Sequence, residues 1–271
     1  MAWSFPGLTR LLFPAKMSRI PTQADFPPAI PPLITVIPPP PTPSGNPPAN
    51  VLLLLHGLGD TAEPFASLAT ALRLPETVCI PLRAPNTLPL GLPGFHWGDD
   101  IHLSHSGTLD PDAGFTKSIG ILQRVVEDTL VTALGYPRRG IFFLGFGQGA
   151  MLALEFAARL RPSIGRDDEY GGVISIGGPL PHSAPSQVVK TPVLLIGSEK
   201  GSLVSAESER RVKSVFSSVR VVRWPGRSKD SMMQNSEEMR DLMEFLARRL
   251  RSWAGTGGPS AQVAELGAMS M

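Results

Sequence analysis

The sequence predicts an α/β fold with a mostly parallel central sheet and helices on both of its faces. Short apolar runs such as 51–55 and 192–196 carry no charge, which is typical of strands buried on both sides. Segments with helical apolar spacing alternate with these runs, as they do in parallel sheets. At 145–149, glycines join one such run directly to a helical pattern, which indicates a very tight strand-to-helix corner.

Each expected element rests on its local pattern. Prolines flank the β-rich run 33–37, so we expect an edge strand there, and alternation at 219–223 indicates another edge strand. Buried strands are expected at 51–55, 78–80, from 141 to the corner, 173–176 and 192–196. Helices are expected at 63–72, 116–134, from the corner to about 160, and at 236–250. In the helix after the corner, Glu155 and Arg159 fall off the apolar face.

Between these elements, residues 83–115 show no sustained period and are rich in proline, glycine and histidine. Loops of this length inside a compact domain are usually lids or binding loops. We therefore expect this excursion, the name used below for residues 83–115, to contribute to a functional site.

Composition narrows the class of protein. The 271 residues fit one large domain at 31–250, preceded by a disordered proline-rich leader at 1–30 and followed by a flexible tail at 251–271. A net charge of +2 without a basic stripe excludes nucleic acid as an expected partner. The single cysteine, Cys79, excludes an intramolecular disulfide and favours a cytoplasmic protein with a buried thiol. No stretch suits a membrane span, and no cofactor is expected.

Three stretches carry a resemblance to a known family. They are His56-Gly57-Leu58-Gly59-Asp60-Thr61, Gly145-Phe146-Gly147-Gln148-Gly149 and the helix Glu238-Met239-Arg240-Asp241-Leu242-Met243-Glu244-Phe245. In this order and spacing, from about Leu33 to Leu250, they resemble the acyl-protein thioesterases and small carboxylesterases of the α/β-hydrolase superfamily, also called phospholipase/carboxylesterases. The resemblance implies an α/β-hydrolase fold and hydrolysis of carboxylic esters or thioesters by a Ser-His-Asp triad.

None of the three triad positions holds the residue that the resemblance implies. The nucleophile position is Gly147, where the family pattern reads Gly-Phe-Ser-Gln-Gly. The acid position falls at Lys200 or Gly201, with Glu199 a carboxylate within reach, and the histidine position falls at Met232. No histidine follows His182 in the chain. A serine hydrolase needs both the hydroxyl and the imidazole, so we expect an inactive triad.

The resemblance also implies binding residues. The backbone N–H groups of Leu58 and Gln148 fall at the oxyanion-hole positions, with His56 and Gly57 shaping the turn before Leu58. The stretch 94–99 is similar to the loop that lines the family's acyl pocket, so Trp97 is expected there. With it, the apolar residues of the excursion form either an acyl groove or packing of the loop onto the sheet. These residues are Leu88, Leu90, Leu92 and Phe95.

Substitute chemistry is possible at two groups of residues. His96, His102 and His105 lie near Asp99 and Asp100, but their spacing fits no metal signature and favours a solvated polar loop. The serines near strand ends, Ser175, Ser198 and Ser202, do not lie in an elbow-like turn.

Three hypotheses of function follow. The first is a non-catalytic homologue that binds an acyl chain, a lipidated protein or another partner. The second is an active ester or thioester hydrolase that uses other residues. The third is a scaffold whose proline-rich segment, such as 38–43, binds a partner.

Overall fold

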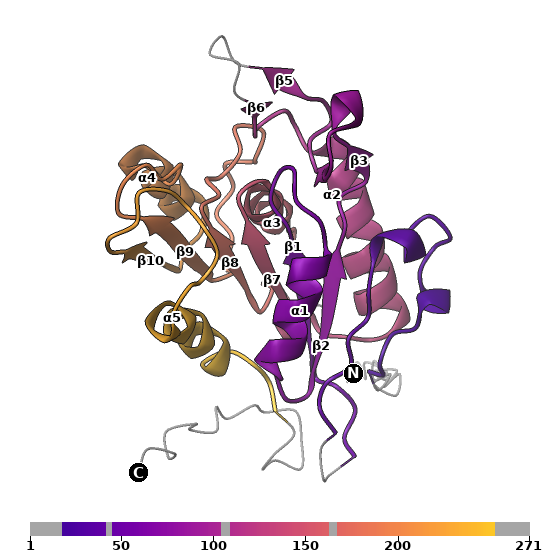
Figure 1. Ribbon diagram of the computed structural model, residues 1–271. Helices are drawn as coiled ribbons and strands as arrows, with labels where there is room; N and C mark the ends of the chain where they lie inside the picture. Colours follow the sequence, from indigo (N-terminus) through magenta and orange to yellow (C-terminus); the bar gives the residue numbers. More distant parts are fainter. Residues whose placement is uncertain (1–17, 42–44, 104–108, 163–166, 253–271) are drawn as a thin grey trace, which may run out of the picture.

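The computed structural model describes residues 18–41, 45–103, 109–162 and 167–252, and it confirms the α/β architecture (Figure 1). Six parallel strands form one sheet in the order β10-β9-β8-β7-β1-β2. The strands are β1 (Asn50–Leu55), β2 (Thr77–Leu82), β7 (Ile141–Phe146), β8 (Gly172–Ile176), β9 (Val193–Ser198) and β10 (Val219–Trp224). Because all six run in the same direction, their carboxyl ends share one edge of the sheet, where ligands bind in open α/β sheets.

Helices cover both faces of this sheet (Figure 1). The helices are α1 (Glu63–Leu72), α2 (Thr116–Leu122) with its π-helical continuation η4 (Gln123–Ala133), α3 (Gln148–Ala158), α4 (Ala206–Val215) and α5 (Ser236–Ala247). Apolar residues of α1 and α5 form the core on one face, and those of α2, α3 and α4 form the larger core on the other. None of the helices in the described ranges has the length and apolarity that a membrane span requires.

The excursion carries only short elements. Strand β3 (Asn86–Thr87) pairs with β4 (Phe95–His96), and β5 (His102–Leu103) pairs with β6 (Leu109–Asp110). Single 3-10 turns occur at η1 (Gln23–Asp25), η2 (Pro31–Leu33), η3 (Pro89–Gly91) and η5 (Arg138–Gly140). Phe95 in β4 forms an antiparallel bridge with Asp60, which lies shortly after β1. The hairpin β3–β4 therefore returns the chain to the carboxyl end of β1.

The predicted edge strand at 33–37 is present only as edge pairing. Ile34 bridges Leu82 and Ile37 bridges Cys79, both antiparallel to β2, without a continuous ladder. The flanking prolines lack the N–H groups that would extend it. Cys79 is buried as predicted, and burial raises the pKa of its thiol to about 12.

Residues 18–30 differ from the expected disordered leader. Phe26 and Ile30 are 5% and 0% exposed and belong to the larger core. The Tyr136 hydroxyl donates to the Arg19 carbonyl oxygen (2.8 Å), which further ties this segment to the domain. The packed body therefore begins before residue 31, whereas residues 1–17 and most of the predicted tail lie outside the described residues.

Two helices also differ from expectation. Glu155, predicted off the apolar face of α3, is 1% exposed because the chain around Ser183 covers that side of the helix. Its carboxylate accepts from Arg159 and from the Ser183 hydroxyl, so the buried charge is compensated. Helix α4 was not predicted, although Ser205 caps it and Val212 and Val215 lie on its buried face.

Candidate functional site

Gly147 is the single residue between β7 and α3. Its φ of 51° and ψ of −117° lie where only glycine is unstrained. Its N–H donates to the Ile176 carbonyl (2.9 Å), and its own carbonyl accepts from Ala150 and Met151. The expected strand-to-helix corner in a costly backbone conformation is therefore present.

The glycines on either side of Gly147 are required by close packing. A Cβ at Gly145 would overlap the backbone of Ala150, and one at Gly149 would overlap the Leu55 carbonyl. At Gly147 itself, the nearest atom to an added Cβ is the Gly57 Cα at 4.0 Å, an ordinary contact. The corner thus has room for a side chain that the sequence does not supply.

Residues 56–60, called the oxyanion turn below, follow β1 and adjoin this corner. The His56 Nε2 accepts the Ala84 N–H (2.9 Å), so its Nδ1 carries the proton and donates to the Gly57 carbonyl (2.7 Å). Burial lowers the pKa of His56 and keeps the ring neutral. With both nitrogens engaged, His56 orients the turn and has no free nitrogen with which to accept a proton.

The two amides at the oxyanion-hole positions are unengaged. Neither the Leu58 N–H nor the Gln148 N–H donates to another group in the described part of the chain. Gln148 is the first residue of α3, where the helix dipole favours negative charge. These two amides can therefore receive a carbonyl or carboxylate oxygen at the corner.

The Gln148 side chain has a role that sequence reasoning missed. Its Oε1 accepts the Trp97 N–H (2.8 Å), and its Nε2 donates to the Pro111 carbonyl (3.1 Å). The Trp97 indole N–H donates to the His56 carbonyl (2.8 Å), and the Ser118 hydroxyl donates to the Trp97 carbonyl (2.6 Å). Together these bonds connect the excursion, the oxyanion turn and the corner.

The apolar residues expected in an acyl pocket are not gathered in one groove. Trp97 is 0% exposed and is a packing residue, while Leu90 and Leu92 are 97% and 54% exposed. Leu88 and Phe95 are half-buried near the oxyanion turn. Leu88 and Phe95 therefore remain the candidates from this set to contact a ligand at the corner.

The acid and histidine positions also hold no catalytic side chain. Lys200 is exposed, and Met232 packs half-buried against the core that α5 covers. Glu199 is exposed, and its carboxylate accepts the Gly226 N–H (2.8 Å). Gly201 lies against the Ser228 carbonyl, so a side chain would not fit there without movement.

Asp230 was not predicted, because the family pattern places a histidine in this segment, at position 232, and no carboxylate. The Asp230 carboxylate accepts the Ser198 N–H (2.8 Å), the Leu203 N–H and the hydroxyls of Ser198 and Ser202 (each 3.0 Å). These four donors occupy its carboxylate oxygens within the two loops. It lies against Gly177 at the end of β8, where an added Cβ would come within 2.6 Å of the Asp230 Cβ.

The histidines of the excursion and Ser175 were the other candidates for substitute chemistry. His96 is 5% exposed instead of solvated, its Nδ1 has no hydrogen-bond partner, and burial lowers its pKa. His105 and the His102 side chain lie outside the described residues. No group of three or more His, Cys, Asp or Glu that could hold a metal occurs within 18–41, 45–103, 109–162 and 167–252. The Ser175 hydroxyl donates to the Gly178 carbonyl inside the core.

Comparison with known proteins agrees with the α/β fold described above. A family model described as Phospholipase/Carboxylesterase matches residues 42–250. An uncharacterized hydrolase of Schizosaccharomyces pombe is 33% identical over 74% of this chain and 83% of its own length. Acyl-protein thioesterase 1 of Saccharomyces cerevisiae is 24% identical over 76% of this chain and 96% of its own. The crystal structure of esterase PE8 has a TM-score of 0.63 at 21% identity, covering 80% and 98%, and supports the fold alone.

Proposed function

The chain belongs to the phospholipase/carboxylesterase family, and on that premise we propose that it is a non-catalytic member that binds an acyl group. The observation that carries this proposal is Gly147, which occupies an elbow with open space for a nucleophile and has no side chain. Acyl transfer through serine needs a hydroxyl to attack the carbonyl and a base to remove its proton.

Among the residues that the structure describes near the corner, we identify none that supplies that base. Both nitrogens of His56 are engaged, and Asp230 accepts four hydrogen bonds. The sequence contains no histidine after His182. The loss extends over three separate segments of the chain, which supports a site that no longer performs hydrolysis.

The receptor for an acyl oxygen is retained. Leu58 follows Gly57, whose Cα lies 4.0 Å from a Cβ added at Gly147, and Gln148 follows Gly147 at the amino end of α3. Such donors stabilise a carbonyl or carboxylate oxygen whether or not a nucleophile is present. This site is therefore suited to hold an acyl group without turning it over.

The test measures turnover and binding on the same preparation. Yeast acyl-protein thioesterase 1 is the positive control for labelling by a fluorophosphonate probe and for hydrolysis of short p-nitrophenyl esters. We expect no labelling or turnover by this chain, but saturable displacement of a fluorescent fatty acid by laurate. Leu58→Pro removes one amide donor and should weaken laurate binding by about tenfold or more.

Stoichiometric labelling would overturn the non-catalytic assignment and favour the alternative of an active ester or thioester hydrolase that uses other residues. Absence of both turnover and acyl binding would overturn acyl binding, leaving a partner-binding role. Thermal unfolding of Leu58→Pro checks that lost binding does not reflect lost folding.

A further inference from the structure

Arg83 is a half-buried cation without an acceptor at the carboxyl end of β2. Its guanidinium carbon lies 4.7 Å from the centroid of the Phe95 ring. Its Nε is enclosed and has no hydrogen-bond partner. Among the described residues, no side-chain atom of Arg83 forms a hydrogen bond or an ion pair. Its terminal nitrogens are not enclosed, so they reach solvent.

Five other buried or half-buried arginines in the described part of the chain have acceptors. Arg138 and Arg227 pair with Glu127 and Glu238, and Arg220 pairs with Asp241. Arg211 and Arg249 donate to backbone carbonyls. A guanidinium held out of bulk water is normally compensated in one of these ways. Arg83 therefore has hydrogen-bonding capacity that the described chain does not use.

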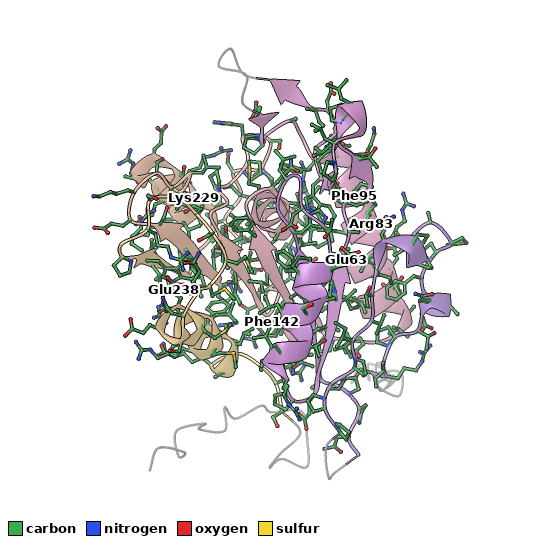
Figure 2. All side chains as sticks on the ribbon, viewed as in Figure 1. Glu63, Arg83, Phe95, Phe142, Lys229 and Glu238 are labelled. Atoms are coloured by element: carbon green, nitrogen blue, oxygen red, sulfur yellow. The ribbon has the colours of Figure 1, made fainter. Side chains whose placement is uncertain are left out.

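The position of Arg83 links it to the acyl-binding site. The Phe95 N–H donates to the Asp60 carbonyl (3.0 Å), and the Phe95 carbonyl accepts the Gly59 N–H (2.9 Å). The ring under the guanidinium is thus fastened to the oxyanion turn, next to Leu58. Figure 2 shows Arg83 beside Phe95, with Glu63 on the neighbouring helix α1.

Glu63 does not neutralise this cation. It is exposed in the first turn of α1, where no ion pair joins it to Arg83. The pKa of Glu63 is lowered first by a hydrogen bond from Thr61 and by its own backbone, and to a lesser degree by Arg83. The nearby His56 ring is neutral. The oxyanion turn is therefore flanked by a positive charge that remains available to a ligand.

We propose that Arg83, stacked on Phe95, is an anion subsite for an acyl ligand that carries a carboxylate or phosphate beyond its acyl carbonyl. This inference rests on the proposed acyl-binding function. Since Nε is enclosed, the ligand meets the two terminal nitrogens end-on, in a geometry that matches the paired oxygens of either anion. Phe95, which is bonded through its backbone to Gly59 and Asp60, provides the ring on which the guanidinium packs.

Matched probes test the subsite. N-lauroylglycine and N-lauroylglycinamide share the acyl chain and amide carbonyl and differ in one carboxylate, while N-lauroyl-O-phosphoethanolamine and N-lauroylethanolamine differ in one phosphate. Titration calorimetry below micelle concentrations measures each affinity. We expect the anionic member of at least one pair to bind about tenfold or more tightly, and Arg83→Gln to abolish that preference without changing the affinity of the neutral member.

Two further variants sharpen the result. Arg240→Gln, at an exposed position on α5, makes the same charge change away from the turn and should leave the preference intact. Arg83→Lys keeps the charge but loses the planar fork, so it should retain only part of the preference.

The outcomes separate this inference from the proposed function. If neutral and anionic probes bind equally, or if the preference survives in Arg83→Gln, the subsite is wrong while acyl binding stands. If no probe of either kind binds, acyl binding itself is wrong and the subsite falls with it. A preference that disappears in Arg240→Gln as strongly as in Arg83→Gln would indicate general charge attraction and overturn the assignment.

Discussion

Gly147→Ser restores the missing hydroxyl at the corner, and its effect on stability follows from the backbone there. No clash is expected, because the nearest atom to the new Cβ is 4.0 Å away. A side chain at this φ and ψ costs about 1–3 kcal/mol, and the reduced freedom of the unfolded chain returns about 0.4–1 kcal/mol. The net loss of up to about 2.5 kcal/mol corresponds to a Tm lower by up to about 10 °C.

Hydrolysis is not expected to return in this variant. The new hydroxyl would lie at the corner, near Gly57 and next to Gln148, but no group in the described structure is placed to accept its proton. Calorimetric unfolding, p-nitrophenyl ester turnover and fluorophosphonate labelling measure the three quantities. Gly147→Ala is the matched control, since it carries the same backbone strain without a hydroxyl.

Two measurements on these variants could contradict the expectations. Ester turnover by Gly147→Ser well above both wild type and Gly147→Ala would show that an unidentified base exists. A Tm above wild type in both variants would show that the corner accepts a side chain without strain, because only the stabilising effect on the unfolded chain would then remain. Combining Gly147→Ser with Met232→His and Lys200→Asp should increase turnover above the single variant, whereas a side chain at Gly201 would meet the Ser228 carbonyl.

Three further predictions concern polar groups inside the fold. Tyr170→Phe removes the 2.7 Å hydrogen bond from its hydroxyl to Glu127 and should cost about 1.5–3 kcal/mol in denaturant unfolding, whereas an unchanged midpoint would contradict this. Asp230→Asn turns an acceptor of four hydrogen bonds into a group with two donors, so unfolding free energy should fall by about 1–3 kcal/mol; unaltered amide exchange at Ser198 would count against it. Burial lowers the pKa of His56 in the folded state, so the unfolded chain takes up a proton first as pH falls below the unfolded pKa of about 6.5. The contribution of neutral His56 to the free energy of unfolding is therefore complete above that pH and is lost below it, by at most about 1.4 kcal/mol per pH unit. Equal stability at pH 7 and pH 5 would refute this.

Strand positions and the corner were predictable because their signals are local. The short uncharged runs at β1 and β9 are typical of strands buried on both faces, and Gly145 and Gly149 permit the close approach at the corner. Helix α4 was missed because its buried face contributes only Val212 and Val215 among many charged residues.

The contacts of the candidate site depend on tertiary structure. The sequence predicts Trp97 as a pocket residue. In the structure its indole N–H donates to the backbone carbonyl of His56, which lies far away in the chain. Arg83 shows no pattern in sequence, since its unsatisfied Nε becomes evident only when the surrounding residues are in place. Asp230 likewise becomes recognisable only when its donors on the neighbouring loop are known.

Asp230 also bears on how reversible the proposed loss of catalysis is. In the family pattern, the loop after β9 supplies the acid and the loop after β10 supplies its histidine partner. Here the loop after β9 supplies the donors and the loop after β10 supplies the carboxylate, so the contact persists with its polarity inverted. A mutational route back that places an aspartate in the loop after β9 while Asp230 is present brings two carboxylates together across these loops. Two facing carboxylates repel each other, so we expect such intermediates to be less stable than the present protein, and the inverted contact therefore disfavours a return to the catalytic triad.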